Sequence, residues 1–369
     1  MKILHVYKTY YPDDVTGVPR FIHTLAESTY KRGFHHEVLA PSAHPSKNAI
    51  KISNHKVFQV KQNFRISSTS ISLSILSKFK SLSSDADVVH YHFPWPIADI
   101  MHLVSGISKP SVLTYHSDIV RQRRHMWLYN PLMNAFLDRM DAIVATSPAY
   151  RQTSCVLQKR LLQTQVIPIG LPERQDVPAG ILSAMRAKVG EGFILFVGAL
   201  RYYKGINYLL QAARATKLPL VIAGKNQDLR LDLRSLPENI VYLGEVTEME
   251  KEALLTLCSG FVLPSHVRSE AFGIALVEAA RAGKPMISCE IGTGTSFVNA
   301  HGETGIVVPP ADSKALADAM RRLLSDRILR QKMGTSARRR FLQRFHAGVM
   351  AQNYTEVYHQ VCERAAQRA

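Results

Sequence analysis

The order of apolar and polar positions divides the first half of the chain into short buried strands separated by helical stretches. Residues 3–7 form an apolar run of strand length, and residues 21–31 have helical spacing and end before Gly33, a typical helix stop. Further strands are predicted at residues 37–40, 57–60, 88–92, 111–115 and 142–146. Strands that alternate with helices predict a parallel sheet covered by helices.

The same alternation starts again after a segment rich in proline and glycine at residues 166–172. Strands are predicted at 193–197, 218–223, 241–243, 260–263, 286–289 and 305–308, and helices at 206–215, 251–257, 272–282 and 313–324. Residues 327–369 are helical in pattern almost throughout. We therefore expect two α/β domains of the doubly wound type, with the boundary at residue 172. Such domains bind ligands at the carboxyl ends of their strands, so two that face each other would share a cleft.

The net charge of +17 on 369 residues calls for an anionic partner or a generally basic surface. Residues 1–170 carry 20 basic and 10 acidic side chains, and the remainder carries 26 and 19, so the excess is spread over both domains. Nucleotide phosphates, acidic lipid headgroups and nucleic acid all fit this charge. The serine-rich stretch 67–84 has an amphipathic pattern, which indicates either a helix packed on the first domain or a helix on an acidic membrane surface.

Two clusters in the second half have residue types suited to chemistry. The first follows the strand at 193–197, where Arg201 and Lys204 precede a predicted helix. Two cations beside a helix start can bind a diphosphate, although an ordinary solvated loop has the same composition.

The second cluster contains Glu270 and Glu278, which are eight residues apart around Gly273. We expect Glu270 in a loop and Glu278 inside the following helix. A carboxylate in an apolar helix needs a partner, either ligand hydroxyls or a nearby cation such as Arg281 or Lys284.

These clusters, with the phrases R-Y-Y-K-G, R-S-E-A-F-G-I and S-C-E-I-G-T-G-T-S-F and the opening M-K-I-L-H-V-Y-K-T-Y-Y-P-D, resemble one large enzyme family over nearly the whole chain. The resemblance is to the retaining glycosyltransferases of the GT-B fold, the family 4 type, and within them to O-antigen mannosyl- and D-rhamnosyltransferases that use GDP-sugars. It implies an acceptor-side Rossmann-like domain at 1–172, a donor-binding one at 173–345 across the cleft, and a helix at 346–369 that crosses back to the first domain.

The resemblance also implies roles for individual residues. Lys204 would contact the donor diphosphate and stabilise the leaving group with help from Arg201, Glu278 would bind the ribose, and Glu270 would approach the hexose. The remaining donor contacts would come from Gly17 in the first loop and from the main-chain amides of Ala271, Phe272, Gly273 and Ile274. His116 would lie near the donor sugar, where a buried strand end with local hydrogen bonds is the alternative. Asp118 would orient the acceptor or its own loop.

The basic loop departs from the family at one position. Many members have an arginine directly after the glycine at position 198, where this chain has Ala199, and Arg201 stands closer to Lys204 instead. Its role is therefore less defined than that of Lys204. In the first loop Thr16 replaces the first glycine of the usual pair.

Two other groups of residues allow alternatives. Arg121 and Arg123 follow the His116 loop and would approach an anionic acceptor such as a polyprenyl-diphosphate-linked glycan, or would lie on a solvated helix face. His90 and His92 have the spacing of a metal pair on one strand face, but acceptor binding or loop packing is the preferred interpretation.

The resulting prediction is a hexosyltransferase that uses a nucleotide-sugar, GDP-mannose or GDP-rhamnose, in polysaccharide synthesis at the inner face of the cytoplasmic membrane. No cofactor and no metal are expected, because the sequence has no strong divalent-metal motif and the resemblance implies none. Cationic side chains and helix N-termini would then neutralise the leaving diphosphate. A GT-B-fold sugar-nucleotide epimerase is the alternative enzyme. A nucleic-acid-binding protein is suggested by charge alone, without a recognisable binding module.

Overall fold

The computed structural model describes residues 1–369 except 67–68, 120–125, 228–235 and 369. The chain divides into two compact units, which are considered separately below. Unit 1 comprises Met1–Gly170 and Ala347–Ala369, and unit 2 comprises Leu171–His346. The first unit ends at Gly170, which is two residues before the boundary expected from the sequence.

The described part of unit 1 is built on an eight-stranded sheet that is parallel except at one edge. Its strands, in spatial order, are β10 (Thr164–Val166), β9 (Ala142–Ala145), β8 (Ser111–Tyr115), β7 (Val88–Phe93), β1 (Lys2–Val6), β2 (His35–Ser42), β4 (His55–Lys61) and β3 (Ile50–Ile52). The edge strand β3 pairs antiparallel with β4. The strands β5 (Phe64–Ile66) and β6 (Thr69–Ile71) form a separate antiparallel pair.

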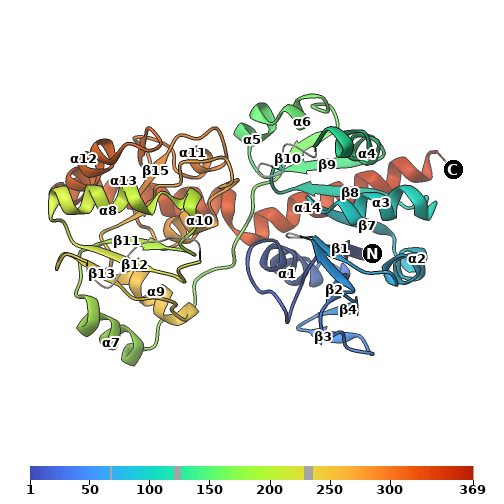
Figure 1. Cartoon of the computed structure of the whole chain (residues 1–369), viewed down its shortest axis with the longest axis horizontal. Coiled ribbons are helices and arrows are strands. Elements are labelled where there is room, and N and C mark those ends of the chain that lie inside the picture. Colours follow the sequence, from blue (N-terminus) through green and yellow to red (C-terminus); the bar gives the residue numbers. More distant parts are fainter. Residues whose placement is uncertain (67–68, 120–125, 228–235, 369) are drawn as a thin grey trace. The chain divides into compact units, whose positions relative to one another are not determined.

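Helices of unit 1 cover this sheet (Figure 1). They are α1 (Gly17–Tyr30), α2 (Ile75–Asp85), α3 (Pro96–Ser105), α4 (Met126–Asp138), α5 (Pro148–Thr153), α6 (Cys155–Gln158) and α14 (Ala347–Ala366). Figure 1 shows α14 running along the sheet beside α1 and β8, which it contacts. It buries the stripe Tyr354, Val357, Tyr358 and Val361, and full burial of each such side chain contributes about 1.5–3 kcal/mol.

Unit 2 is built on a parallel sheet in the order β13 (Ile240–Tyr242), β12 (Leu220–Ala223), β11 (Ile194–Val197), β14 (Gly260–Leu263), β15 (Met286–Cys289) and β16 (Gly305–Val308). Its helices are α7 (Ala179–Val189), α8 (Ile206–Thr216), α9 (Glu248–Leu257), α10 (Ile274–Arg281), α11 (Thr295–Val298), α12 (Ser313–Ser325) and α13 (Arg327–Arg340), followed by a π-helical turn at Phe341–Phe345. This is the strand order of a Rossmann sheet, in which β11 and β14 flank the point where the chain reverses its direction of winding.

The serine-rich stretch is only in part the helix that its pattern suggested. Helix α2 begins at Ile75 and buries Ile75, Phe79 and Leu82, whereas Thr69–Ile71 is a strand. The described part of that stretch thus packs its apolar helical face into unit 1.

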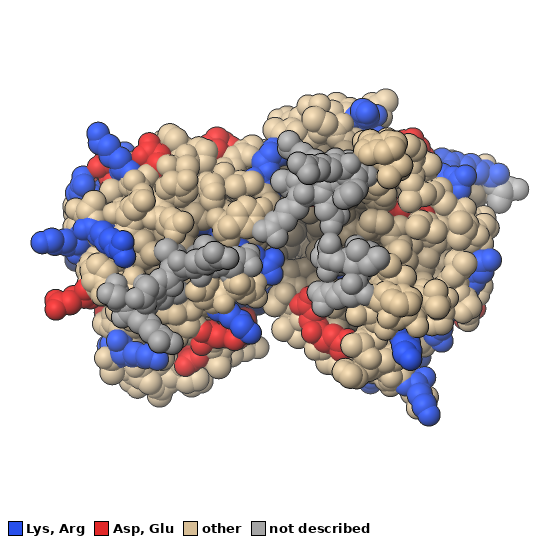
Figure 2. All heavy atoms as spheres, in the orientation of Figure 1, with Lys and Arg blue, Asp and Glu red and all other residues tan. Residues whose placement is uncertain are grey.

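Basic side chains on the face shown in Figure 2 are scattered over both units among acidic ones, as the charge count of the sequence indicates. Among the described residues, none of the helices has the length and apolarity needed to cross a bilayer.

Candidate active site

The loop that follows β11 is held directly against the loop that follows β14. It makes one turn of 3-10 helix at Tyr202–Lys204, and Gly205 then has a φ of 71°. A Cβ atom on Gly205 would lie 2.0 Å from the carbonyl oxygen of Pro264, so a side chain has no room there. This close approach brings Lys204 to the residues after β14, at the switch point of the sheet.

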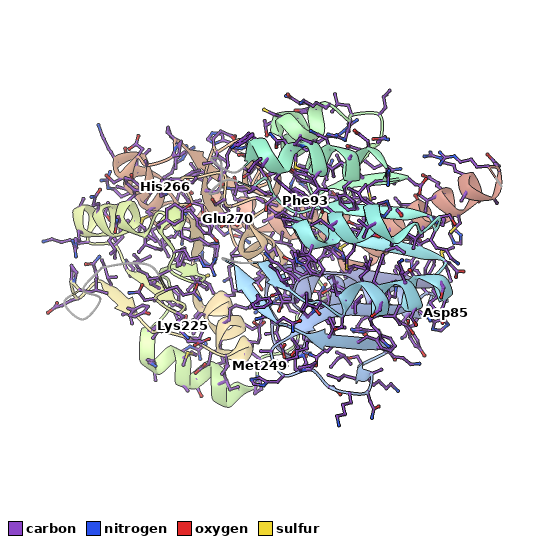
Figure 3. All side chains as sticks on the ribbon, turned by 45° about the vertical axis from the view of Figure 1, so that its right-hand side comes forward. Asp85, Phe93, Lys225, Met249, His266 and Glu270 are labelled. Atoms are coloured by element: carbon purple, nitrogen blue, oxygen red, sulfur yellow. The ribbon has the colours of Figure 1, made fainter. Side chains whose placement is uncertain are left out.

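Lys204 forms an ion pair with Glu270, which lies on the loop after β14 and is labelled in Figure 3. The two side chains are only 13% and 11% exposed. Ser265 also donates from Oγ to Oε2 of Glu270, at 3.1 Å. Burial alone would lower the pKa of Lys204, but the charge and hydrogen bond of Glu270, together with Tyr203, outweigh burial, and the pKa lies above its ordinary value. The ammonium group is therefore a fixed positive charge at neutral pH.

The main chain before α10 offers hydrogen-bond donors beside this pair. Gly273 caps the helix with a φ of 85°. Within the described part of the chain, no hydrogen bond from the four amides of residues 271–274 is recorded. Unsatisfied amides at a helix start attract anions, and the helix dipole adds to this effect. These amides suit the donor contacts predicted for Ala271, Phe272, Gly273 and Ile274, which stay a prediction.

Glu278 lies inside α10 and Glu270 in the loop before it, as expected. Glu278 is 6% exposed and accepts a hydrogen bond at Oε1 from Nζ of Lys251, at 2.7 Å. Lys251 also pairs with Glu248 on its own helix. The sequence suggested Arg281 or Lys284 as the structural partner of Glu278. In the described contacts Arg281 pairs instead with Glu252 on α9, and Lys284 donates to the carbonyl oxygens of Thr256 and Cys258.

Arg201 is exposed. Its Nε donates a hydrogen bond to Oε1 of Gln227, on the loop after β12, at 2.7 Å. Arg201 directly precedes the turn that ends at Lys204. The structure therefore places it at the same sheet edge as Lys204 without joining it to the Lys204–Glu270 pair.

In unit 1, the switch point of the sheet lies between β1 and β7. Gly17 follows the loop after β1 and is the first residue of α1, with a φ of 53°. A Cβ atom there would meet nothing within 4 Å, so the space beside it is open within the described structure.

His116 directly follows β8 and is 8% exposed. Its Nε2 lies 3.1 Å from Nδ1 of His92, and its ring makes a T-shaped contact with the ring of Phe21. Burial, and then the charge of Lys8, lower the pKa of His116 to about 3. The imidazole is consequently neutral throughout the physiological range.

Asp118 holds its own loop in place. Its carboxylate accepts hydrogen bonds from Tyr115 at 2.9 Å and from Ser154 at 2.6 Å, and its amide donates to the hydroxyl of Tyr150. Of the two roles suggested by the sequence, these contacts support orientation of the loop. Arg121 and Arg123, the other predicted acceptor-binding residues, lie outside the described residues.

His90 and His92 are interior residues of β7, exposed by 0% and 1%. His92 also packs against His116 in the loop after β8, as one of the two preferred interpretations expected, whereas acceptor binding stays a prediction. The alternation along the strand turns the rings of His90 and His92 toward α1 and α14, as contacts with Phe21 and Tyr354 show. His5 and His36 join them and were missed by the sequence analysis. The sequence does show histidines at interior positions of the predicted strands. Only the strand register reveals that their side chains meet.

The arrangement in unit 2 combines a fixed cation, a run of amides and two buried carboxylates. Cations and amides bind phosphate oxygens, while carboxylates accept hydrogen bonds from hydroxyl groups. A ligand that carries both a diphosphate and several hydroxyls fits this combination.

Comparisons with known proteins point the same way. A family model described as Glycosyltransferase Family 4 matches residues 15–172, and one described as Glycosyl transferases group 1 matches residues 183–340. The chain is 44% identical to the O-antigen chain mannosyltransferase C of Escherichia coli, over 97% of this chain and 98% of the other. It is 45% identical to the D-rhamnosyltransferase WbpZ of Pseudomonas aeruginosa, over 94% and 93%.

Among solved structures, the sucrose-phosphate synthase of Thermosynechococcus elongatus is similar with a TM-score of 0.80 and 21% identity, over 98% of both chains. At this identity the likeness concerns the fold.

Proposed function

The chain belongs to glycosyltransferase family 4 and has the GT-B fold, and on that premise we propose that it transfers mannose or rhamnose from a GDP-linked donor. The proposed acceptor is a glycan, or a polyprenyl-diphosphate-linked glycan, in O-antigen synthesis. The names of the two relatives with 44% and 45% identity support this choice of sugar and process.

One observation carries the proposal for the donor: the Lys204 ammonium is fixed at the switch point of unit 2, beside amides at the start of α10. A preorganised cation stabilises the negative charge that develops on a leaving diphosphate. Since Glu270 already holds Lys204 in place, little reorganisation is needed when the donor binds. Arg201, from its position on the same loop, would supply a second contact to the diphosphate.

The two carboxylates have separate parts in the proposal. Glu270, on the loop beside Lys204, would accept hydrogen bonds from hexose hydroxyls. Glu278, inside α10, would accept them from the ribose of the nucleotide. Lys251 supports the second role because its hydrogen bond to Oε1 holds the Glu278 carboxylate in one orientation.

Residues of unit 1 complete the proposal. His116, a neutral imidazole at the end of β8, would meet the hexose, and the open space beside Gly17 would admit the diphosphate. Arg121 and Arg123 would attract the anionic acceptor, and Asp118 would fix the loop that carries them. Transfer would retain the anomeric configuration and take place at the membrane surface on its cytoplasmic side.

A panel of GDP-, UDP- and ADP-sugars in a thermal-shift assay tests the donor. We expect the largest stabilisation with GDP-mannose or GDP-rhamnose, because ligand binding to the folded state raises the melting temperature. Incubation of the preferred donor with a lipid-linked glycan should give a product whose new linkage has the donor's anomeric configuration. Stabilisation by none of the sugars, or conversion of the donor without an acceptor as in an epimerase, would contradict the proposal.

A further inference from the structure

Buried histidines from neighbouring strands share one face of the unit 1 sheet. His5 on β1 is paired in register with His90 on β7. His92 lies two residues beyond His90, His116 follows the adjacent β8, and His36 lies on β2. Side chains two residues apart on a strand share a face, so all these rings meet beneath α1 and α14.

The ring nitrogens of four of these histidines form one continuous line of hydrogen bonds that ends on α1. The successive contacts are Thr29 Oγ1 to His36 Nε2 at 2.7 Å, His36 Nδ1 to His5 Nε2 at 2.8 Å, His5 Nδ1 to His92 Nε2 at 3.0 Å and His92 Nδ1 to His116 Nε2 at 3.1 Å. Below, these five residues are called the imidazole chain. It connects the interior of α1 to the predicted active-site histidine.

Thr29 fixes the direction of the hydrogen bonds. Its Oγ1 lies 2.7 Å from the carbonyl oxygen of Leu25, one turn earlier in the helix. Two oxygens at that distance repel each other unless a proton lies between them, so the hydroxyl hydrogen is donated to Leu25. Oγ1 is then an acceptor toward His36, and Nε2 of His36 must carry a proton.

The direction then passes along the whole line. A neutral imidazole has one N–H and one bare nitrogen. Burial keeps these rings neutral, with the pKa of His36 lowered to about 3 and those of His5 and His92 lowered well below the ordinary value. Since each ring donates from Nε2, each must accept at Nδ1 from the next ring. The last donor is Nε2–H of His116.

We propose that Thr29, His36, His5 and His92 are positioning residues that hold His116 in its Nε2–H tautomer, so that its Nδ1 presents a lone pair to the substrate. Nδ1 of His116 has no recorded hydrogen bond within the described structure, and it is not among the buried atoms that lack a partner. The atom therefore has some exposed surface among the described residues, where its lone pair can meet a ligand.

This tautomer restricts what can bind there. A bare nitrogen accepts a hydrogen bond from a hydroxyl and repels the oxygens of a phosphate or a carboxylate. The group that meets His116 is accordingly a hydroxyl and not the diphosphate. That it is a sugar hydroxyl rests on the proposed function, whereas the tautomer itself does not depend on any substrate.

A metal ion is the competing explanation for such a cluster, because ligand atoms of His5, His90 and His92 lie within 4.8 Å of one another. However, both ring nitrogens of His5 already serve the chain. His90 is bonded instead to the hydroxyls of Tyr358 and Thr114, each within hydrogen-bond distance. The rings are thus satisfied as neutral groups, and a metal would have to break these bonds.

The tautomer can be read directly in the ligand-free protein. In protein labelled with ¹⁵N in its histidine rings, multiple-bond ¹H–¹⁵N correlation spectra distinguish a protonated from a bare ring nitrogen. His116→Gln identifies the signals of His116 by their loss. We expect the Nε2–H pattern for His116 at pH 7, before any donor is added.

Variants at the far end of the chain test the coupling. Thr29→Val keeps the branched shape and removes the anchoring acceptor, so the signal of His116 should become a mixture of tautomers. Thr29→Ser restores a hydroxyl and should restore the wild-type pattern. The matched control is Tyr358→Phe, which removes a buried hydroxyl bonded to His90, a histidine that is not part of the imidazole chain. This variant should leave the His116 pattern unchanged.

Activity with the preferred donor provides a second measurement. We expect kcat/KM to fall about tenfold in Thr29→Val, the effect of one neutral hydrogen bond, and to recover in Thr29→Ser. An Nδ1–H tautomer of His116 in the wild type, an unchanged tautomer in Thr29→Val, or a stoichiometric metal in the purified protein would each overturn the inference. Because the spectra need no donor, the tautomer result does not depend on the proposed function. A different tautomer, in turn, would leave the donor assays of the proposed function unaffected.

Discussion

Replacement of Lys204 by methionine gives the sharpest test of the donor site. The side chain keeps its length but loses the charge, which leaves the Glu270 carboxylate, only 11% exposed, without its cation. Among the described residues, the hydroxyl of Ser265 is then the side-chain donor that still bonds to the Glu270 carboxylate. Breaking a buried ion pair from one side destabilises a protein by about 3–5 kcal/mol, and the partial exposure of this pair favours the lower end of that range.

Loss of the cation should also slow catalysis. Removal of one preorganised group that stabilises developing negative charge lowers kcat by about 10²–10³, or about 2.7–4 kcal/mol. The stability and activity effects can be separated with the double variant Lys204→Met/Glu270→Gln, in which no charge is left unpaired. We expect the double variant to recover most of the lost stability while its activity stays at or below that of Lys204→Met.

The assay combines urea unfolding, followed by far-UV circular dichroism, with steady-state kinetics of sugar transfer. Glu270→Gln alone is measured to isolate the carboxylate. Lys314→Met is the control, since it makes the same change at an exposed lysine of unit 2 and should alter neither quantity. If Lys204→Met stays within tenfold of wild-type activity, the assignment of Lys204 to the leaving group is refuted. Wild-type stability of that variant would refute the reasoning about the buried pair.

Three further predictions concern single sites and pH. Glu278→Ala should weaken donor binding in isothermal titration about 10–100-fold, the effect of one hydrogen bond to a charged group. The variant should still fold, because Lys251 keeps the Glu248 carboxylate as a partner. Unchanged affinity would contradict the ribose role. Gly205→Ala should lower the stability of unit 2 by about 2 kcal/mol or more, because a Cβ would lie 2.0 Å from a carbonyl oxygen at positive φ. In the same thermal scans Gly180→Ala should cause no loss of stability, because its Cβ meets open space and alanine favours a helix. Acidification from pH 7 to 5.5 should destabilise unit 1 by about 1 kcal/mol for each buried neutral histidine. His36 and His116, with pKa values of about 3, stay unprotonated in the folded protein, whereas in the unfolded chain they take up protons near pH 6.5. Both tryptophans lie in unit 1, so their fluorescence during urea unfolding checks the last prediction, and pH-independent stability over this range would disprove it.

Much of the fold could be predicted from the sequence because its strands are short apolar runs with clear ends. The run at 193–197 ends at Gly198, and the run at 260–263 ends at Pro264, as β11 and β14 do. Local signals of this kind do not report which strands become neighbours. The fold class therefore came from the alternation of elements and from the resemblance.

The site was predictable residue by residue, but its pairings were not. Lys204 and Glu270 were singled out separately, 66 positions apart in the sequence, and their ion pair depends on the order of β11 and β14 in the sheet. The Lys251 partner of Glu278 lies on another helix and gives no local signal. In the same way, His5 and His36 each look like ordinary strand residues until the register places them side by side.

The return of α14 to unit 1 has a consequence for biosynthesis. Unit 1 is made of the first 170 residues and of residues after 346, so the ribosome completes all of unit 2 before unit 1 has its last helix. Until then His90 and Thr114 lack the hydroxyls of Tyr358 and Tyr354, and the part of the histidine face that α14 covers stays open. The half of the protein that is synthesised first is thus the half that can finish folding last.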